Sequence, residues 1–151
     1  MQTVRSLRWM HASRRCEAER ICMKFNALIP ELTVTDLERS RAFYVGVLGF
    51  RIEYERPENR FLFLSRERIQ LMLEEENGHW SVGELRYPFG RGINFEMTVS
   101  DVDALYRAVL DVGITPFREL TVSRYRSGDA DIVQKEFLVQ DPDGFLLRFT
   151  D

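Results

Sequence analysis

The chain has 151 residues, of which 30% are charged and 44% hydrophobic, and its 24 acidic and 21 basic side chains give a net charge of −3. That length suits one domain with a single core. No run approaches the roughly 18 apolar residues of a membrane span, and the acidic balance argues against a nucleic-acid surface. We therefore expect a globular protein whose partners include neither membrane nor nucleic acid.

The first 22 residues differ in composition from the rest. They hold five arginines and two glutamates, a net charge of +3, and they lack the continuous apolar run of a secretory signal. The glutamates weaken a transit-peptide interpretation, and Met23 stands directly before the first strand-like run. We predict that residues 1–22 are a disordered or mis-called extension of a single domain, 23–151. Because Cys16 and Cys22 both lie in this extension, we expect no disulfide framework and a reducing, cytoplasmic setting.

An internal repeat organises the remainder. The sequence LTVTDLERSRAFY at residues 32–44 recurs as MTVSDVDALYRAV at residues 97–109, 65 positions later. Each copy has an apolar strand that ends in Thr-Val and is followed by a helix-start signal. The chain is therefore predicted to contain two copies of one structural unit.

The helix-start signal in each copy is a hydroxyl residue followed three places later by an acid. Thr35 with Glu38 has the capping-box spacing, and Ser100 with Asp103 is a looser version. Each predicted helix then runs into a glycine, Gly49 or Gly113. The apolar residues lie at helical spacing and predict one buried face per helix: Leu37, Tyr44 and Val47 in the first helix, and Val102, Leu105 and Val109 in the second.

Short strand-like runs follow each helix. After the first helix they are residues 50–54, 60–65 and 69–75, and the second copy ends with residues 136–140 and 145–150. The last two runs are joined by Asp141-Pro142-Asp143-Gly144, in which proline presets a bend and glycine accepts a positive φ. Residues 121–132 are polar, and we predict a mobile loop there. Both copies then read β-α-β-β-β.

Three short sequences in the first copy, together with the closing Asp-Pro-Asp-Gly, resemble the vicinal-oxygen-chelate superfamily, which includes glyoxalases, bleomycin-resistance proteins and extradiol dioxygenases. They are Thr33-Val34-Thr35-Asp36-Leu37, Phe43-Tyr44 and Val47-Leu48-Gly49-Phe50. The resemblance spans about residues 27–151, with repeats at about 27–75 and 92–151. It implies an α+β fold in which two βαβββ repeats form a curved, eight-stranded mixed sheet around an open pocket, with the helices outside.

Enzymes of this superfamily hold a divalent metal on strands 1, 4, 5 and 8, where the resemblance places Ile29, Met72, Asn94 and Arg148 here. A hard divalent ion needs carboxylate or imidazole donors. Methionine suits soft metals, and arginine brings a fixed positive charge. With only two histidines in the chain, we predict no metal, no other cofactor and no catalytic residues.

Side chains two places apart on a strand share a face, so the pocket lining can be written down. It holds three acids, Glu31, Glu74 and Glu96, against Arg148, with Thr33, Gln70, Thr98, Leu146 and Thr150 as further members. Arg148 either binds an anionic group of a ligand or pairs with one of the carboxylates. A third possibility is that the three glutamates form an all-oxygen site for a hard cation.

Aromatic side chains near this lining suggest stacking on a planar ligand. Phe61 and Phe63 lie on the third strand, and Trp80, Tyr87 and Phe89 lie in the loop between residues 76 and 91. Alternatively, Trp80 anchors that loop. The predicted ligand-binding residues are Glu31, Phe61, Phe63, Met72, Glu74, Trp80, Asn94, Glu96 and Arg148.

Residues 70–74 and 141–148 resemble the bleomycin-resistance proteins in particular. This resemblance implies a homodimer that sequesters a cationic or polar-aromatic, antibiotic-like molecule in a crevice between subunits and so confers resistance without catalysis. Arg91-Gly92 stand where some relatives carry an aromatic residue, which argues against bleomycin itself. The alternatives are an enzyme of the superfamily with an atypical carboxylate metal site or a metal-free acid-base pair such as Glu31 and Glu96, and a duplicated domain that serves assembly or regulation.

Overall fold

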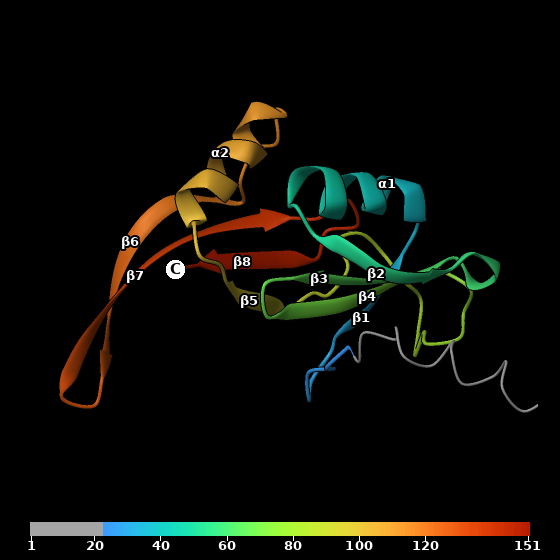
Figure 1. The fold of residues 1–151 in the computed structure, drawn as a ribbon, viewed down its shortest axis with the longest axis horizontal. Helices are drawn as coiled ribbons and strands as arrows, with labels where there is room; N and C mark the ends of the chain where they lie inside the picture. The colour runs from blue at the N-terminus through green and yellow to red at the C-terminus, as the bar shows by residue number, and fades with distance from the viewer. Residues whose placement is uncertain (1–22) are drawn as a thin grey trace, which may run out of the picture.

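In the computed structural model, which describes residues 23–151, the chain forms two βαβββ modules joined by a long loop (Figure 1). The predicted α+β fold is therefore confirmed. The first module contains β1 (Glu31–Val34), α1 (Leu37–Arg41), η1 (Ala42–Val47), β2 (Arg51–Arg56), η2 (Pro57–Asn59), β3 (Phe61–Arg66) and β4 (Ile69–Glu75). The second contains β5 (Asn94–Thr98), α2 (Val102–Asp111), β6 (Arg118–Ser127), β7 (Ala130–Gln140) and β8 (Leu146–Thr150).

The eight strands form two four-stranded sheets with the same topology. The strand orders are β1-β4-β3-β2 and β5-β8-β7-β6, and in each sheet only the first pair is parallel. The registers also match, because Glu31 pairs with Met72 just as Glu96 pairs with Arg148. Both helices lie on the same side of the two sheets, so the other face of each sheet carries the candidate site (Figure 1).

The core lies between the helices and the sheets and is continuous across the two modules. In the central strands alternate apolar side chains are buried in this core, as are Leu32 and Val34 of β1. Burying one such side chain contributes about 1.5–3 kcal/mol. The largest fully buried side chains of this core come from both modules: Tyr44, Phe137 and Phe149. None of the helices in residues 23–151 is long and apolar enough to cross a membrane.

Aspartates, not the predicted hydroxyl residues, cap the two helices. The Asp36 carboxylate accepts hydrogen bonds from the backbone N–H groups of Glu38 and Arg39, and Asp101 accepts one from Ala104. The capping-box prediction was thus wrong by one position. Aspartate is as good a cap as serine or threonine, and the neighbouring hydroxyl residues are occupied elsewhere.

Those hydroxyl residues, Thr35 and Ser100, join the modules reciprocally. The Thr35 backbone N–H and hydroxyl donate to the Asp143 carboxylate in the β7–β8 turn, and the Ser100 N–H and hydroxyl donate to Glu67 in the β3–β4 turn. Each module thus binds the other's strand-to-helix junction through an acid in its last hairpin turn. These contacts fix how the two open sheet faces sit side by side.

The predicted loop at residues 121–132 is instead part of a long hairpin formed by β6 and β7. The paired residues run from Arg118 with Leu138 to Ser127 with Ala130. The hairpin projects beyond the rest of the second sheet, at the left of Figure 1. Most residues of the projecting part are exposed on both faces. Residues 121–132 therefore do not show the alternation of apolar and polar residues by which a half-buried strand is recognised in a sequence.

Candidate functional site

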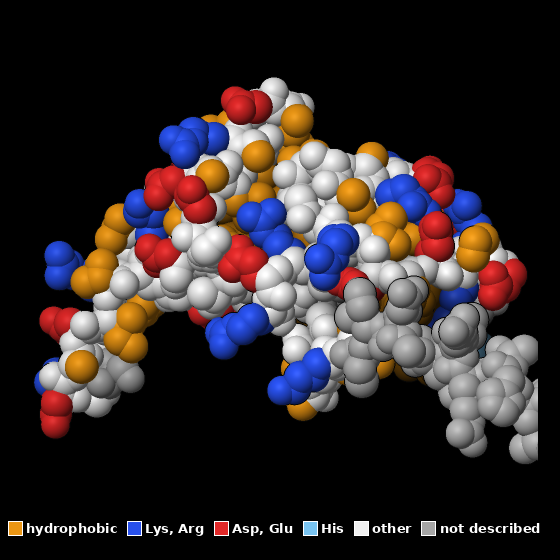
Figure 2. All heavy atoms as spheres, viewed as in Figure 1, with side chains coloured by type: hydrophobic (Ala, Val, Ile, Leu, Met, Phe, Trp, Pro, Cys, Tyr) orange, Lys and Arg blue, Asp and Glu red, His pale blue; other side chains and the backbone are white. Residues whose placement is uncertain are grey.

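The face opposite the helices is hollowed between the projecting hairpin and the first module, as Figure 2 shows. Three of the hollows on the two modules contain predicted site residues. The acidic hollow, about 600 Å³, is lined by Glu31, Phe61, Met72, Glu74 and Trp80, among others. The junction groove, about 420 Å³, lies where β4 and β5 approach and includes Asn94 and Glu96. The arginine hollow, about 470 Å³, includes Glu96 and Arg148. Of the nine predicted residues, five line the first hollow and three line the other two, while Phe63 lines none of them.

The acidic hollow is organised around Glu74 of β4. The Trp80 indole Nε1 donates to Glu74 Oε2 at 2.8 Å, and Asn77 Nδ2 donates to Glu74 Oε1 at 2.7 Å. This bond fits the loop-anchor interpretation of Trp80. However, the Trp80 side chain remains 59% exposed. One side chain therefore both ties the loop to β4 and presents an aromatic surface beside a carboxylate.

A second carboxylate, Glu31, stands next to Glu74. Burial, followed by the hydrogen bond and charge of Glu74, raises the pKa of Glu31, and Arg56 opposes that rise. Two neighbouring carboxylates repel each other unless a proton or a cation lies between them. The whole lining holds five glutamates and two arginines, so its charge balance also favours a cation.

An aromatic ladder fills the open face of the first sheet beside the acidic hollow. The Tyr54 ring stacks on Phe61 and Phe63, with centroids 5.9 and 5.0 Å apart, and the Arg56 guanidinium lies 4.5 Å above Phe61. Phe25, from the segment before β1, packs edge-on against Phe63. Phe61 and Phe63 are consequently buried, and a ligand would have to displace one of the covering side chains to stack on them.

Sequence reasoning missed the three covering residues of this ladder. Tyr54 and Arg56 lie two residues apart on β2 and so share one face of the strand. The period of two along that strand could therefore have identified them. Phe25 lies outside every strand, and no local pattern marks it. Phe89, predicted as a stacking residue, is buried against Phe145 and belongs to the packing of its loop.

In the arginine hollow, Arg148 is fully engaged by protein groups. Its Nε donates to Glu136 Oε2 at 2.5 Å, and its NH1 lies 3.3 Å from Glu96 Oε2. Burial disfavours the charge, but the hydrogen bond and charge of Glu136, with Glu96, raise the pKa of Arg148. Of the two predicted roles, the structure therefore shows the pairing with carboxylates. Glu136, which is buried on β7, was not foreseen as the main partner.

The positions that hold a metal in related enzymes do not fit one here. Ile29 precedes β1 and offers no donor, Met72 is a soft donor, and the Arg148 guanidinium is paired with two glutamates. Glu31 and Glu74 share the acidic hollow, whereas Glu96 lines the other two. Within residues 23–151, no three His, Cys, Asp or Glu side chains gather as a possible metal site. The all-oxygen site of three glutamates is therefore not assembled.

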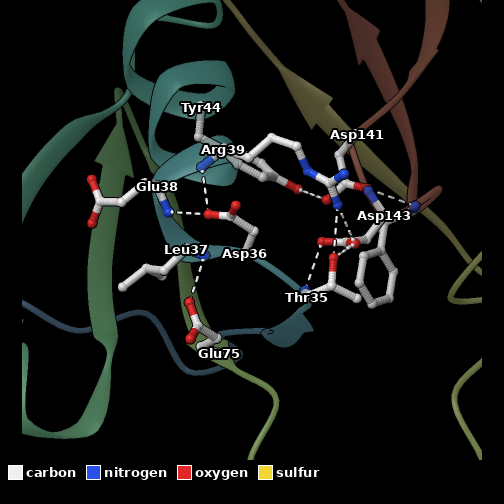
Figure 3. Close-up of polar contacts among 10 residues, drawn as sticks. Thr35, Asp36, Leu37, Glu38, Arg39, Tyr44, Glu75, Asp141 and Asp143 are labelled. Atoms are coloured by element: carbon white, nitrogen blue, oxygen red, sulfur yellow. Dashed lines mark hydrogen bonds and ion pairs between the residues drawn. The ribbon is translucent and has the colours of Figure 1, made fainter.

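A buried polar network lies on the opposite, helix side of the sheets (Figure 3). The Asp141 carboxylate accepts hydrogen bonds from the Tyr44 hydroxyl at 2.9 Å and from the backbone N–H groups of Asp143 and Phe145. Burial raises the pKa of Asp141 to about 6, against the lowering effect of these bonds. Asp143 in turn accepts from Thr35 and from Arg39 at 2.8 Å. Tyr44, Asp141 and Asp143 are buried and line none of the three hollows, and the bonds from Tyr44, Thr35 and Arg39 join the first module to the closing turn of the second.

Comparison with known proteins identifies the fold family. The family model described as Glyoxalase/Bleomycin resistance protein/Dioxygenase superfamily matches residues 25–149. No curated protein matches the chain.

Among solved structures, a superfamily member from Vibrio splendidus 12B01 is 37% identical over 81% of this chain and 94% of its own, with a TM-score of 0.38. TioX from Micromonospora sp. ML1 is 23% identical over 83% and 98%, with a TM-score of 0.64. A glyoxalase/bleomycin resistance protein/dioxygenase from Alicyclobacillus acidocaldarius is 24% identical over 83% and 90%, with a TM-score of 0.58.

Proposed function

Since the chain belongs to the glyoxalase/bleomycin resistance protein/dioxygenase superfamily, we propose that it is a non-catalytic binding protein that sequesters a cationic, polar-aromatic molecule of the antibiotic type. The ligand occupies the acidic hollow. The observation that carries this proposal is the pair of carboxylates, Glu31 and Glu74, beside the exposed indole of Trp80.

The chemistry of the hollow supports this ligand class. A cation that enters between Glu31 and Glu74 removes their mutual repulsion and gains charge-assisted hydrogen bonds, which are the stronger kind. A planar ring attached to that cation can lie on Trp80, where a cationic ring also interacts favourably with the indole face. The volume of the hollow, about 600 Å³, suits a small molecule, and Phe61, Met72 and Trp80 add apolar surface to its polar lining.

The absence of suitable metal donors favours capture over conversion. The four positions at which related enzymes hold their ion provide one thioether, one amide and one paired guanidinium, in addition to an alkyl side chain. We propose that protection comes from stoichiometric binding, in a cytoplasmic setting. Cell fractionation followed by immunoblotting tests the compartment, and recovery in a membrane or extracellular fraction would contradict it.

We further propose that the protein works as a homodimer, with the acidic hollow opening onto a crevice between subunits. The hollow is open on the single chain and leaves Trp80 more than half exposed, so a second subunit can complete its wall. Light scattering coupled to size-exclusion chromatography measures the mass directly. A monomer at micromolar concentration, with or without ligand, would refute this part of the proposal.

Proflavine, a flat cationic acridine, is a suitable probe of the site. We expect binding that quenches Trp80 fluorescence, and a Glu74→Gln variant should bind about 10- to 100-fold more weakly because a hydrogen bond to a charged group is lost. Glu84→Gln, an exposed glutamate of the same loop paired with Arg86, is the matched control. Trp80→Phe assigns the quenching, because Trp9 is the other tryptophan of the chain.

Two further measurements separate this proposal from its alternatives. Calorimetry with metal-free and copper-loaded bleomycin tests one member of the ligand class. Elemental analysis of the purified protein tests the enzyme alternative, because one tightly held divalent ion per chain would favour a carboxylate metal site over passive capture. Proflavine binding that is equal in Glu74→Gln and wild type would place the ligand outside the acidic hollow.

A further inference from the structure

The segment before β1 lies across the open face of the first sheet. The Phe25 ring meets Phe63 edge-on, with centroids 5.5 Å apart and an interplanar angle of 87°. The Asn26 backbone N–H donates to Gln70 Oε1 at 2.7 Å, and Gln70 Nε2 donates to the Lys24 carbonyl at 2.9 Å. Asn26 Nδ2 also donates to the Arg68 carbonyl at 2.6 Å. We call residues 24–28 the strap.

The strap stands between two of the hollows. Phe63, which Phe25 covers, is the strand partner of Met72, and Met72 lines the acidic hollow. Asn26 and Leu28 line the junction groove on the other side. The strap therefore borders the 420 Å³ junction groove and covers Phe63, the neighbour of a residue that lines the 600 Å³ acidic hollow.

The strap is weakly attached compared with the sheet beneath it. Within the described residues it is held by the three hydrogen bonds above and one aromatic edge contact. Its apolar side chains bury little surface, because Phe25 is 55% exposed and Leu28 is 82% exposed, whereas Phe63 is 1% exposed. Segments with few buried apolar contacts open at a small fraction of the global unfolding free energy.

We propose that the strap is displaceable and that the Phe25 ring occupies the subsite of an aromatic ring of the ligand. This proposal rests on the proposed function, since it extends the acidic hollow rather than replacing it. When the strap moves away, the edge of Phe63 that Phe25 covers becomes accessible beside Tyr54 and Phe61. The two hollows then join into one groove. The ligand class is then a cation that carries an extended aromatic portion, with the charge near Glu31 and Glu74.

Replacing the ring tests the subsite. In Phe25→Ala the ligand no longer has to break the contact between Phe25 and Phe63. The interaction energy of such an aromatic pair corresponds to roughly a two- to tenfold change in affinity, so we expect Phe25→Ala to bind proflavine about two- to tenfold more tightly than wild type. Phe117→Ala is the matched control, because Phe117 is 58% exposed in the loop before β6. Spermidine, a cation without a ring, should bind both variants and wild type equally. Unchanged or weaker proflavine binding by Phe25→Ala would overturn the subsite.

Amide hydrogen exchange tests the strap without any ligand. The Asn26 amide can exchange only when its bond to Gln70 opens, and we expect it to exchange at least about 100-fold faster than the Leu64 amide in the central strand β3. Gln70→Ala should accelerate it further, and proflavine should accelerate it in wild type. Exchange at Asn26 as slow as at Leu64 would refute a displaceable strap, whatever the dye does. A protein that opens its strap but binds no proflavine would instead refute the proposed function.

Discussion

Replacing Asp141 by asparagine should change how stability depends on pH. Asp141 is buried, and its carboxylate accepts bonds from two backbone N–H groups and from the Tyr44 hydroxyl. Asparagine keeps an oxygen for the two N–H groups and can donate its amide to the Tyr44 oxygen. The substitution therefore removes the titration while preserving the shape of the network (Figure 3).

The magnitude follows from the pKa of Asp141, which burial raises from the usual 3.8 to about 6. A group whose pKa is higher in the folded state stabilises that state below the unfolded pKa and loses the contribution as the pH rises through the folded pKa. At 1.36 kcal/mol per unit, a shift of roughly two units corresponds to about 3 kcal/mol, lost between about pH 4 and pH 6. The Asp141→Asn variant has no carboxyl group at this position and would show no such loss.

The assay is urea unfolding followed by circular dichroism at pH 4, 5, 6 and 7. Other carboxylates, such as Asp36 and Glu75, have lowered pKa values and give wild type an opposite slope, so the informative quantity is the difference between variant and wild type. We expect Asp141→Asn to gain about 3 kcal/mol relative to wild type from pH 4 to pH 7. Asp111→Asn, an exposed change at the end of α2, is the control. A pH-independent difference would refute the burial argument.

Three further substitutions test the helix cap, the closing turn and the acidic hollow. Asp36→Ala removes the cap of α1 and should cost about 1 kcal/mol in urea unfolding, and a variant as stable as wild type would contradict this cap. Gly144→Ala should lower the melting temperature strongly, because φ is +90° there and a Cβ would lie 2.5 Å from the Cβ of Pro88; a variant as stable as wild type would contradict that packing. Met72→Arg should abolish proflavine binding measured by fluorescence, because a guanidinium beside Glu31 and Glu74 replaces the cation; retained binding would place the probe elsewhere.

The sequence predicted those parts of the fold that local patterns encode. The repeat identified both modules, the glycines marked the helix ends, and Asp141-Pro142-Asp143-Gly144 forms the expected turn, with the Gly144 N–H donating to the Asp141 carbonyl at 3.0 Å. The β6–β7 hairpin was missed because its exposed faces give no hydrophobic period. Its projecting part depends on pairing between β6 and β7, whereas the base of β7, which includes Phe137 and Val139, is buried in the core.

The site was less predictable because its decisive contacts are long-range. Strand alternation put Glu31, Met72 and Glu74 on one face, and these three residues line one hollow, whereas Asn94, Glu96 and Arg148 of the same predicted lining lie in the other two. The partners of predicted residues come from distant elements, such as Phe25 covering Phe63 and Glu136 holding Arg148. No local pattern specifies such pairs, and only coordinates distinguish a free aromatic ring from a covered one.

The duplication places an uncharged residue in one module where the other module carries a cation. Met72 and Arg148 occupy equivalent registers opposite Glu31 and Glu96. In the second module the guanidinium of Arg148 forms ion pairs with both Glu96 and Glu136, so these carboxylates already have a cation beside them. In the first module Met72 is uncharged, and burial, followed by the hydrogen bond and charge of Glu74, raises the pKa of Glu31. The equivalent position of the second module thus supplies, from within the protein, the positive charge that a ligand brings to the acidic hollow under the proposed function.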